Sequence, residues 1–264
     1  MTNTLLKLNQ LVVGYSTPLV SDINIQVHEG EIIAIVGPSG IGKTTIIRTI
    51  GGLIRPIDGS VELLVEPRGG LGYVPQKLGL VRHASVEHNI TLGAISSSHT
   101  IQQASRFRSI GLCILIVSLG IWFFKNPFAP PLFFLGCMLY IPSIIATIVY
   151  TNQLKKTVVK QAMEDVGLTE KRLEPVRRLS GGQQRRVATA RTLAQSPSLI
   201  VADEFLSELD QANAMIVLNA MRKLTDAGSS MIMVEHNIER ARSVADRIWT
   251  IKDGSLVQEV IEHA

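Results

Sequence analysis

The chain has 264 residues, which suits one large domain or one domain with an appendage. Hydrophobic residues make up 46% of it and charged residues 18%, a mixture that excludes an intrinsically disordered chain. The net charge of +4 fits a nucleic-acid binder or a protein on an anionic membrane surface, and does not distinguish the two.

The cysteines and the N-terminus bear on the cellular compartment. Cys113 and Cys137 have no metal-ligand spacing and form no disulfide framework, so we expect a reducing compartment. The first residues lack a basic start followed by a long apolar run, and we therefore expect no secretion signal.

The first part of the chain predicts strands around a glycine-rich loop. Short apolar runs between residues 5 and 36 are divided by turn residues, and the last run, Ile32–Val36, is apolar without interruption, as in a strand buried on both faces. GPSGIGKTT follows at residues 37–45 and leads into a helix. Residues 57–76 predict a short β section, and residues 81–95 predict the start of a small helical section.

The second part alternates helices with buried strands. Helices are predicted over residues 153–176, after residue 179 and over residues 212–227. The runs LIVAD and SMIMVEH predict two more buried strands, and a terminal hairpin turns at Asp253 and Gly254. This alternation implies an α/β fold with a largely parallel sheet.

The glycine-rich loop fits the phosphate-binding pattern G-x-x-x-x-G-K-[ST] through Gly37, Gly42, Lys43 and Thr44. Glycines let backbone N–H groups surround phosphate oxygens, and the helix N-terminus adds a positive dipole end. Lys43 would reach the β- and γ-phosphates, and the Thr44 hydroxyl would ligate Mg²⁺. The expected nucleotide contacts are Gly37, Pro38, Ser39, Gly40, Ile41, Gly42, Lys43, Thr44 and Thr45.

Two acids follow the buried run LIVA. Asp203 and Glu204 stand where a strand ends, which is where ligands bind in open α/β sheets. We expect Asp203 to hold Mg²⁺ and Glu204 to polarise the attacking water. Further upstream, Ser180, Gly181 and Gly182 open a helix and offer donors to a phosphate.

Taken in order, these motifs resemble those of the nucleotide-binding subunits of ATP-binding cassette (ABC) transporters. The resemblance covers residues 1 to about 95 and about 155 to 264. Tyr15, Gln76 or His236 alone would be an ordinary structural residue, and the ordered set favours the functional interpretation. The matching segments are GPSGIGKT as Walker A, Gln76 as the Q-loop glutamine, LSGGQ (with Ser180, Gly181, Gly182 and Gln183) as the signature motif, LIVADE as Walker B, Asp210 in the D-loop, His236 as the switch histidine and Tyr15 as the adenine-stacking aromatic.

The resemblance implies an ABC-type P-loop cassette, with a mixed β-sheet core and a helical subdomain, that binds ATP and Mg²⁺ and hydrolyses ATP. It implies catalytic roles for Glu204, His236, Lys43 and Gln76, and metal contacts from Thr44, Gln76 and Asp203. It also implies a head-to-tail pair of ATPase subunits in which LSGGQ of one chain closes over ATP on the other. The implied partners are integral-membrane permease subunits and an extracytoplasmic substrate-binding protein, with no nucleic acid.

The chain departs from the family pattern at two positions. Phe205 stands where proline usually follows the glutamate, and Glu235 stands where a small hydroxyl residue usually precedes the histidine. Because neither change removes a catalytic group, we still predict hydrolysis.

An apolar insert is predicted at residues 97–152, within an ATPase domain formed by residues 1–96 and 153–264. Residues 109–124 and 126–154 carry no charge, and a membrane helix needs about 20 apolar residues. The sequence therefore predicts a two-helix hairpin that is embedded in membrane lipid, either spanning the bilayer or deeply inserted in it. Basic residues at both ends place those ends on the cytoplasmic face of the membrane. A buried soluble hairpin and an in-plane interfacial segment are the alternatives.

Three functions are weighed. The first is the ATPase subunit of an ABC transporter, the second is an ABC ATPase that drives lipid extraction or envelope remodelling, and the third is a soluble ABC protein acting on DNA or ribosomes. The single cassette and the apolar insert argue against the third. The basic pairs Arg177-Arg178 and Arg185-Arg186 are interpreted as solvated or phosphate-proximal faces.

Overall fold

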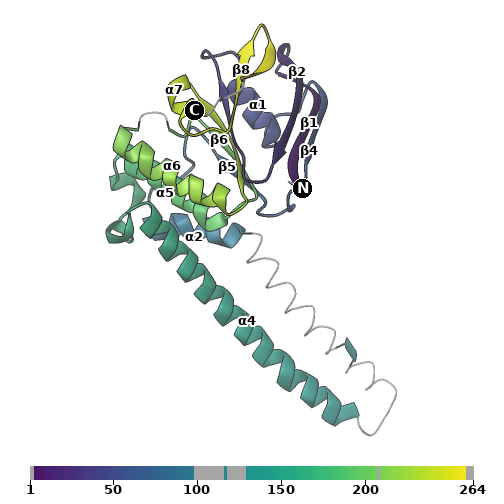
Figure 1. Ribbon diagram of the computed structural model, residues 1–264. Coiled ribbons are helices and arrows are strands. Elements are labelled where there is room, and N and C mark those ends of the chain that lie inside the picture. Colours follow the sequence, from purple (N-terminus) through teal and green to yellow (C-terminus); the bar gives the residue numbers. More distant parts are fainter. Residues whose placement is uncertain (1–2, 98–115, 118–128, 207–208, 260–264) are drawn as a thin grey trace.

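The computed structural model describes residues 3–97, 116–117, 129–206 and 209–259 (Figure 1). A nine-stranded sheet runs through the described part in the order β4-β1-β2-β9-β8-β3-β7-β6-β5. Its strands are β1 (Thr4–Gly14), β2 (Pro18–His28), β3 (Ile32–Val36), β4 (Asp58–Leu63), β5 (Leu71–Val74), β6 (Leu199–Asp203), β7 (Ser230–Glu235), β8 (Arg247–Lys252) and β9 (Ser255–Glu259).

Helices cover this sheet and lead away from it. They are α1 (Lys43–Ile50), α2 (Val86–Ser96), α4 (Ala129–Asp165), α5 (Gly181–Gln195), α6 (Gln211–Asp226) and α7 (Ile238–Arg242), with short 3₁₀ turns at Thr169–Lys171 and Val176–Arg178. In Figure 1, α2, α5 and α6 lie together on one side of the molecule, and α1 lies on the other side beside β1 and β2.

The centre of the sheet is parallel, as the alternation of strands and helices predicts. Strands β8, β3, β7, β6 and β5 pair in parallel, whereas β1 pairs antiparallel with both β2 and β4. The predicted terminal hairpin is confirmed, because β8 and β9 pair antiparallel with Lys252 opposite Ser255. Its turn residues Asp253 and Gly254 both have positive φ (48° and 73°), which matches the twist of a two-residue hairpin.

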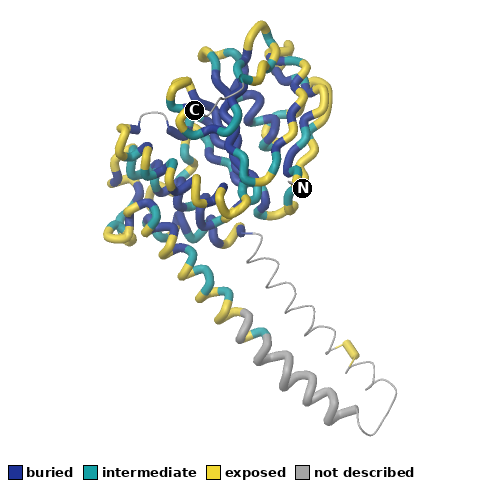
Figure 2. Tube along the Cα trace, in the orientation of Figure 1, coloured by how far each residue is buried: buried dark blue, intermediate teal, exposed yellow. Residues whose placement is uncertain are grey.

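Both faces of the central strands are buried, which explains their uninterrupted apolar runs. In β3, Ile33 and Ile35 pack with α1 and the β1–β2 layer, while Ala34 and Val36 pack with the helices on the other face. Figure 2 shows the resulting buried centre between two more exposed surfaces. A strand with helices on both faces has no need for alternating polar residues.

The long helix α4 joins the body only through its C-terminal part. Val159, Ala162, Met163 and Val166, at and just after its end, are buried in the core shared with α2 and α5. The rest of the helix leads away from the body, and its described apolar residues there, Ile145, Ile148, Val149 and Tyr150, are exposed (Figures 1 and 2).

The expected membrane-embedded hairpin is not supported. Over the described residues, no helix combines the length and the apolar character needed to cross a bilayer. The first half of that hairpin and its turn, residues 109–128, lie outside the described residues except for Ile116 and Val117. α4 continues without a break past residue 152, where the sequence predicted the insert to end.

Candidate functional site

The candidate site lies at one edge of the sheet, where four neighbouring parallel strands end. Gly37 follows β3 and His236 follows β7. Asp203 ends β6 and Glu204 follows it, and Gln76 stands two residues beyond β5. Because the carboxyl ends of parallel strands meet at one edge, residues up to about 200 positions apart in sequence become neighbours.

The phosphate loop connects β3 to α1. Gly40 and Gly42 have φ angles of 81° and 118°, and a Cβ atom on Gly42 would lie only 2.8 Å from the Val20 side chain. Glycine is therefore required at this position for both conformation and space. Gly42 caps α1 without a side-chain hydrogen bond, which leaves the first amides of the helix available to an anion.

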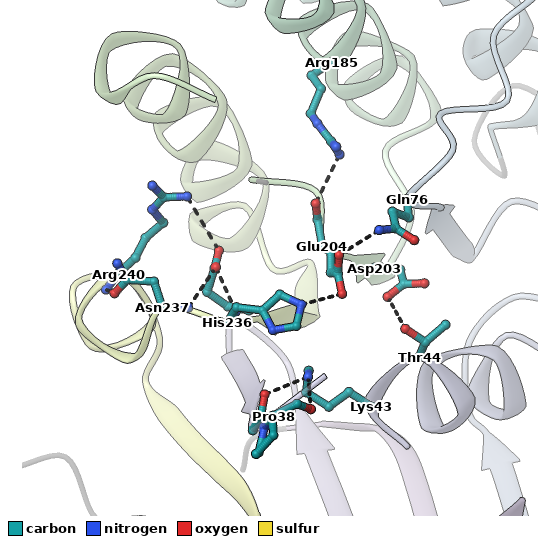
Figure 3. Close-up of polar contacts among 12 residues, drawn as sticks. Pro38, Lys43, Thr44, Gln76, Arg185, Asp203, Glu204, His236, Asn237 and Arg240 are labelled. Atoms are coloured by element: carbon teal, nitrogen blue, oxygen red, sulfur yellow. Dashed lines mark hydrogen bonds and ion pairs between the residues drawn. The ribbon is translucent and has the colours of Figure 1, made fainter. Parts of the chain in front are cut away.

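Lys43 is buried at the start of α1 with its ammonium group turned onto the loop. Its Nζ donates to the carbonyl oxygens of Gly37 (2.7 Å) and Pro38 (2.8 Å), as Figure 3 shows. Burial lowers the pKa of Lys43, and the charges of Glu204 and Asp203 oppose that shift. A cation held against backbone carbonyls at a helix N-terminus is suited to meet phosphate oxygens.

Thr44 and Asp203 form a small oxygen cluster beside Lys43. The Thr44 hydroxyl donates to Asp203 Oδ1 at 2.9 Å, while Asp203 Oδ2 is buried and has no hydrogen-bond partner. Burial raises the pKa of Asp203, against the hydrogen bond from Thr44, and the nearby Glu204 adds to the increase. An unsatisfied carboxylate oxygen next to a hydroxyl is a donor set of the kind that Mg²⁺ prefers.

Glu204 is held between two side chains from other strands. Gln76 Nε2 donates to Glu204 Oε2 at 2.8 Å, and His236 Nε2 lies 2.6 Å from Glu204 Oε1 (Figure 3). Glu204 adopts a left-handed backbone conformation with φ of 49°, which is uncommon for a residue other than glycine. The geometry thus brings together three of the residues expected to act in hydrolysis.

Arg185 is a further residue of the candidate site, and the sequence did not predict its role there. Its side chain is buried, and its Nη1 donates to the backbone carbonyl of Glu204 at 3.1 Å. Arg186 donates to the Val166 carbonyl at 3.0 Å. Arg185 is therefore buried and not part of a solvated face, whereas Arg177 and Arg178 are exposed. Only the apolar helical spacing around Arg185 could have indicated a buried arginine.

The signature residues lie across the sheet from the phosphate loop. Ser180 caps α5 through a capping box, in which Ser180 Oγ accepts from the Gln183 amide (3.3 Å) and Gln183 Oε1 accepts from the Ser180 amide (3.1 Å). Gly181 and Gly182 form the first turn of the helix. α5 packs with the core on the face opposite α1, so the structure does not bring these residues to the phosphate loop of their own chain.

Tyr15 and Asp210 lie on the surface. Tyr15 directly follows β1, and 65% of its surface is exposed. Asp210 caps α6 by accepting from the Asn213 amide at 2.7 Å, and this bond holds the pKa of Asp210 below its usual value.

A buried strand, a glycine loop with lysine and threonine, and two acids at the end of a nearby strand define a P-loop nucleotide hydrolase. A family model described as ABC transporter matches residues 20–207. The chain belongs to this family, and it is an ATP-binding subunit with ATPase activity.

Curated relatives have related functions. The glutamine transport ATP-binding protein GlnQ of Geobacillus stearothermophilus is 30% identical over 91% of this chain and 84% of its own length. The glutamate transport ATP-binding protein GluA of Corynebacterium efficiens is 28% identical over 91% and 83%. The methionine import ATP-binding protein MetN of Nocardia farcinica is 31% identical, and the chain spans 60% of its length.

Solved structures share the fold. CbiO1 from Clostridium perfringens, part of the ABC transporter complex CbiONQ, aligns over 97% of this chain and 88% of its own with a TM-score of 0.68 and 21% identity. A nucleotide-free ATP-binding cassette from an ABC transporter aligns over 98% and 92% with a TM-score of 0.68 and 18% identity.

Proposed function

We propose that this chain powers solute uptake through separate permease subunits by binding and hydrolysing ATP at the edge formed by β3, β7, β6 and β5. The observation that carries the proposal is the Glu204 carboxylate, held between Gln76 and His236 beside the phosphate loop. Several relatives are named for import or transport of amino acids, which supports uptake rather than export.

Each residue of the site has a defined task in the proposed reaction. The loop amides from Gly37 to Thr45 cradle the phosphates, and Lys43 exchanges the Gly37 and Pro38 carbonyls for β- and γ-phosphate oxygens. Glu204 orients a water and accepts its proton as the water oxygen attacks the γ-phosphorus. The bond from that phosphorus to the β–γ bridging oxygen then breaks, releasing ADP and phosphate.

Thr44, Asp203 and Gln76 would hold Mg²⁺ with the nucleotide. The free, buried Asp203 Oδ2 and the adjacent Thr44 hydroxyl fit such an ion, and the metal would supply neutralisation of phosphate charge. The switch histidine, His236, would contact the γ-phosphate, and the exposed Tyr15 would stack on adenine.

The active unit is a head-to-tail dimer. Because Ser180, Gly181, Gly182 and Gln183 lie across the sheet from the phosphate loop, they would complete the ATP site of a second subunit. ATP then acts as the link between two chains, and hydrolysis releases them.

Permease subunits would dock on the same side as the signature helix. A cleft of about 590 Å³ there is lined by Gln76, Lys77, Arg82, Gly181 and Arg185, among others. A permease element in this cleft would touch Gln76, which donates to Glu204, and α5, which begins with the signature residues. On this proposal the chain would lie at the cytoplasmic face of a membrane, with residues 97–152 as an insert in the ATPase domain formed by residues 1–96 and 153–264. A membrane subunit should co-purify with it in detergent.

The substitution Glu204→Gln tests the chemistry. Gln keeps the size of the side chain but cannot accept the proton, so we expect turnover to fall by at least about 100-fold while ATP binding persists. Phosphate release and fluorescent-nucleotide titration measure the two properties separately. Turnover within about twofold of wild type would refute the role of Glu204 as base.

A further inference from the structure

Glu235, the last residue of β7, is a buried carboxylate beside the reaction centre that the proposed mechanism does not use. Only 6% of its surface is exposed. Its Oε1 accepts from the backbone amides of His236 (2.9 Å) and Asn237 (3.2 Å). Glu235 pairs across the sheet with Val36, the residue before the phosphate loop. The carboxylate thus fixes the backbone of His236, which sets where the His236 ring lies.

The second oxygen of Glu235 faces an arginine that reaches the neighbouring loop. Glu235 Oε2 lies 4.0 Å from Arg240 Nη1, and the same Nη1 donates to the backbone carbonyl of Leu206 at 3.0 Å (Figure 3 shows Arg240 and His236 in this part of the site). Leu206 is fully buried and stands two residues after Glu204. Arg240 is held in turn by α7, whose N-terminus Asn237 caps by accepting from the Arg240 amide at 3.0 Å.

These contacts close a ring around the catalytic pair. The loop after β7 touches the loop after β6 twice, through His236 on Glu204 and through Arg240 on Leu206. Glu235 supports both contacts. One of its oxygens accepts from the His236 amide, and the other faces Arg240. Glu235 is buried and Arg240 half-buried, so the Glu235 carboxylate is retained at a cost in desolvation, which suggests a role in fixing geometry.

We infer that Glu235 and Arg240 are positioning residues for hydrolysis, which set the distance between the His236 ring and the Glu204 carboxylate. This inference rests on the proposed roles of Glu204 and His236. The pair acts only through those two residues and touches neither ATP nor water. Loss of the pair lets the two loops move independently, so that the nucleotide still binds but the attacking water is misaligned.

The test separates the rate of turnover from nucleotide binding and from folding. Glu235→Gln keeps an oxygen for the two amides and removes the charge that faces Arg240, and Arg240→Gln removes the link to Leu206. For each we expect kcat to fall by about tenfold, with KM for ATP changed by less than about twofold and Tm within about 3 °C of wild type. The double variant should be no slower than the slower single variant, because both substitutions disrupt the same connected set of contacts and their effects should not add.

Arg242→Gln is the matched control. Arg242 is on the same short helix but pairs with Glu259 on the surface at 3.3 Å, so its loss should leave kcat unchanged. An unchanged kcat in Glu235→Gln and Arg240→Gln, multiplicative losses in the double variant, or a joint fall in kcat and Tm would each overturn the positioning role. If Glu204→Gln also retained wild-type turnover, the proposed role of Glu204 as base, on which this inference rests, would fail; if only the Glu235 and Arg240 variants did, the positioning role alone would fail.

Discussion

At the scale of single residues, the buried carboxylate of Asp203, which suits Mg²⁺ binding, lowers the stability of the folded protein. Its carboxylate is 1% exposed, and one of its two oxygens has no hydrogen-bond partner. Burial raises its pKa above the ordinary 3.8, so the folded protein binds a proton at this group more strongly than the unfolded chain does. The ionised group therefore destabilises the fold above its folded-state pKa, and the cost disappears as the pH falls towards 3.8.

We predict that Asp203→Asn stabilises the nucleotide-free protein at neutral pH. Removing the charge should add about 1 kcal/mol, or about 2–4 °C in Tm. The advantage should shrink as the pH is lowered from neutral towards 3.8, because the wild-type group takes up its proton in the folded protein before it would in the unfolded chain. Thermal unfolding of both proteins across that range gives the measurement. An advantage that grew as the pH fell would contradict the assigned direction of the pKa shift.

The residues that the sequence identified are those whose role depends on a local motif. Lys43 and Thr44 follow a glycine loop, and Asp203 and Glu204 end an apolar strand. Arg185 and Glu235 could not be assigned in this way, because their partners, the Glu204 carbonyl and the Arg240 side chain, depend on tertiary contacts and turn geometry that no local pattern encodes. Residue type alone also favours the surface for both.

At the scale of elements, α2 and α5 pack so closely that a side chain is excluded between them. A Cβ atom on Gly93 of α2 would lie 2.0 Å from the carbonyl oxygen of Arg191 in α5. Arg191 in turn donates to the carbonyls of Leu78 and Gly79, just after Gln76. The separation of the two helices thus influences the position of the Q-loop.

We predict that Gly93→Ala destabilises the protein by about 1–3 kcal/mol, because the helices must move apart to admit the methyl group. Chemical denaturation measures the loss of stability. Gly181→Ala is the control, since a Cβ there meets nothing within 4 Å and should leave the stability equal or slightly higher. Equal stability of Gly93→Ala and wild type would show that the helices accommodate the methyl group freely.

Secondary-structure elements were predictable where their burial leaves a clear pattern of apolar residues in the sequence. The central strands are covered on both faces, and their unbroken apolar runs were assigned correctly. The membrane hairpin was not supported: the described residues Ile145, Ile148, Val149 and Tyr150 of the predicted insert are exposed, and burial begins only beyond residue 152. The C-terminal part of α4 buries Val159, Ala162 and Met163 against the protein's own helices, and over the described residues no helix meets the requirements of a membrane span.

At the scale of the whole molecule, the fold brings only some of the predicted site residues together. The four strand ends supply the phosphate loop, the two acids, Gln76 and His236, while the signature turn lies on the other face of the sheet. In the single chain Gly181 is exposed, and a Cβ atom added to it would meet no atom within 4 Å. The conformational freedom of glycine is not needed there, because Gly181 is in an ordinary helical turn. The absence of a side chain there fits the proposed dimer, in which a second subunit's nucleotide would need this space.

We therefore predict that Gly181→Ala separates folding from function. Its Tm should match or slightly exceed that of wild type, and the monomer should bind ATP normally, since its own phosphate loop is unchanged. ATP hydrolysis should fall by about tenfold or more, and ATP-dependent dimerisation should weaken, because the added methyl group would occupy the position of the partner's phosphates. Light scattering of Glu204→Gln with and without the second substitution measures dimerisation without turnover. A Gly181→Ala protein that dimerised and hydrolysed ATP like wild type would show that the signature turn does not close the second site.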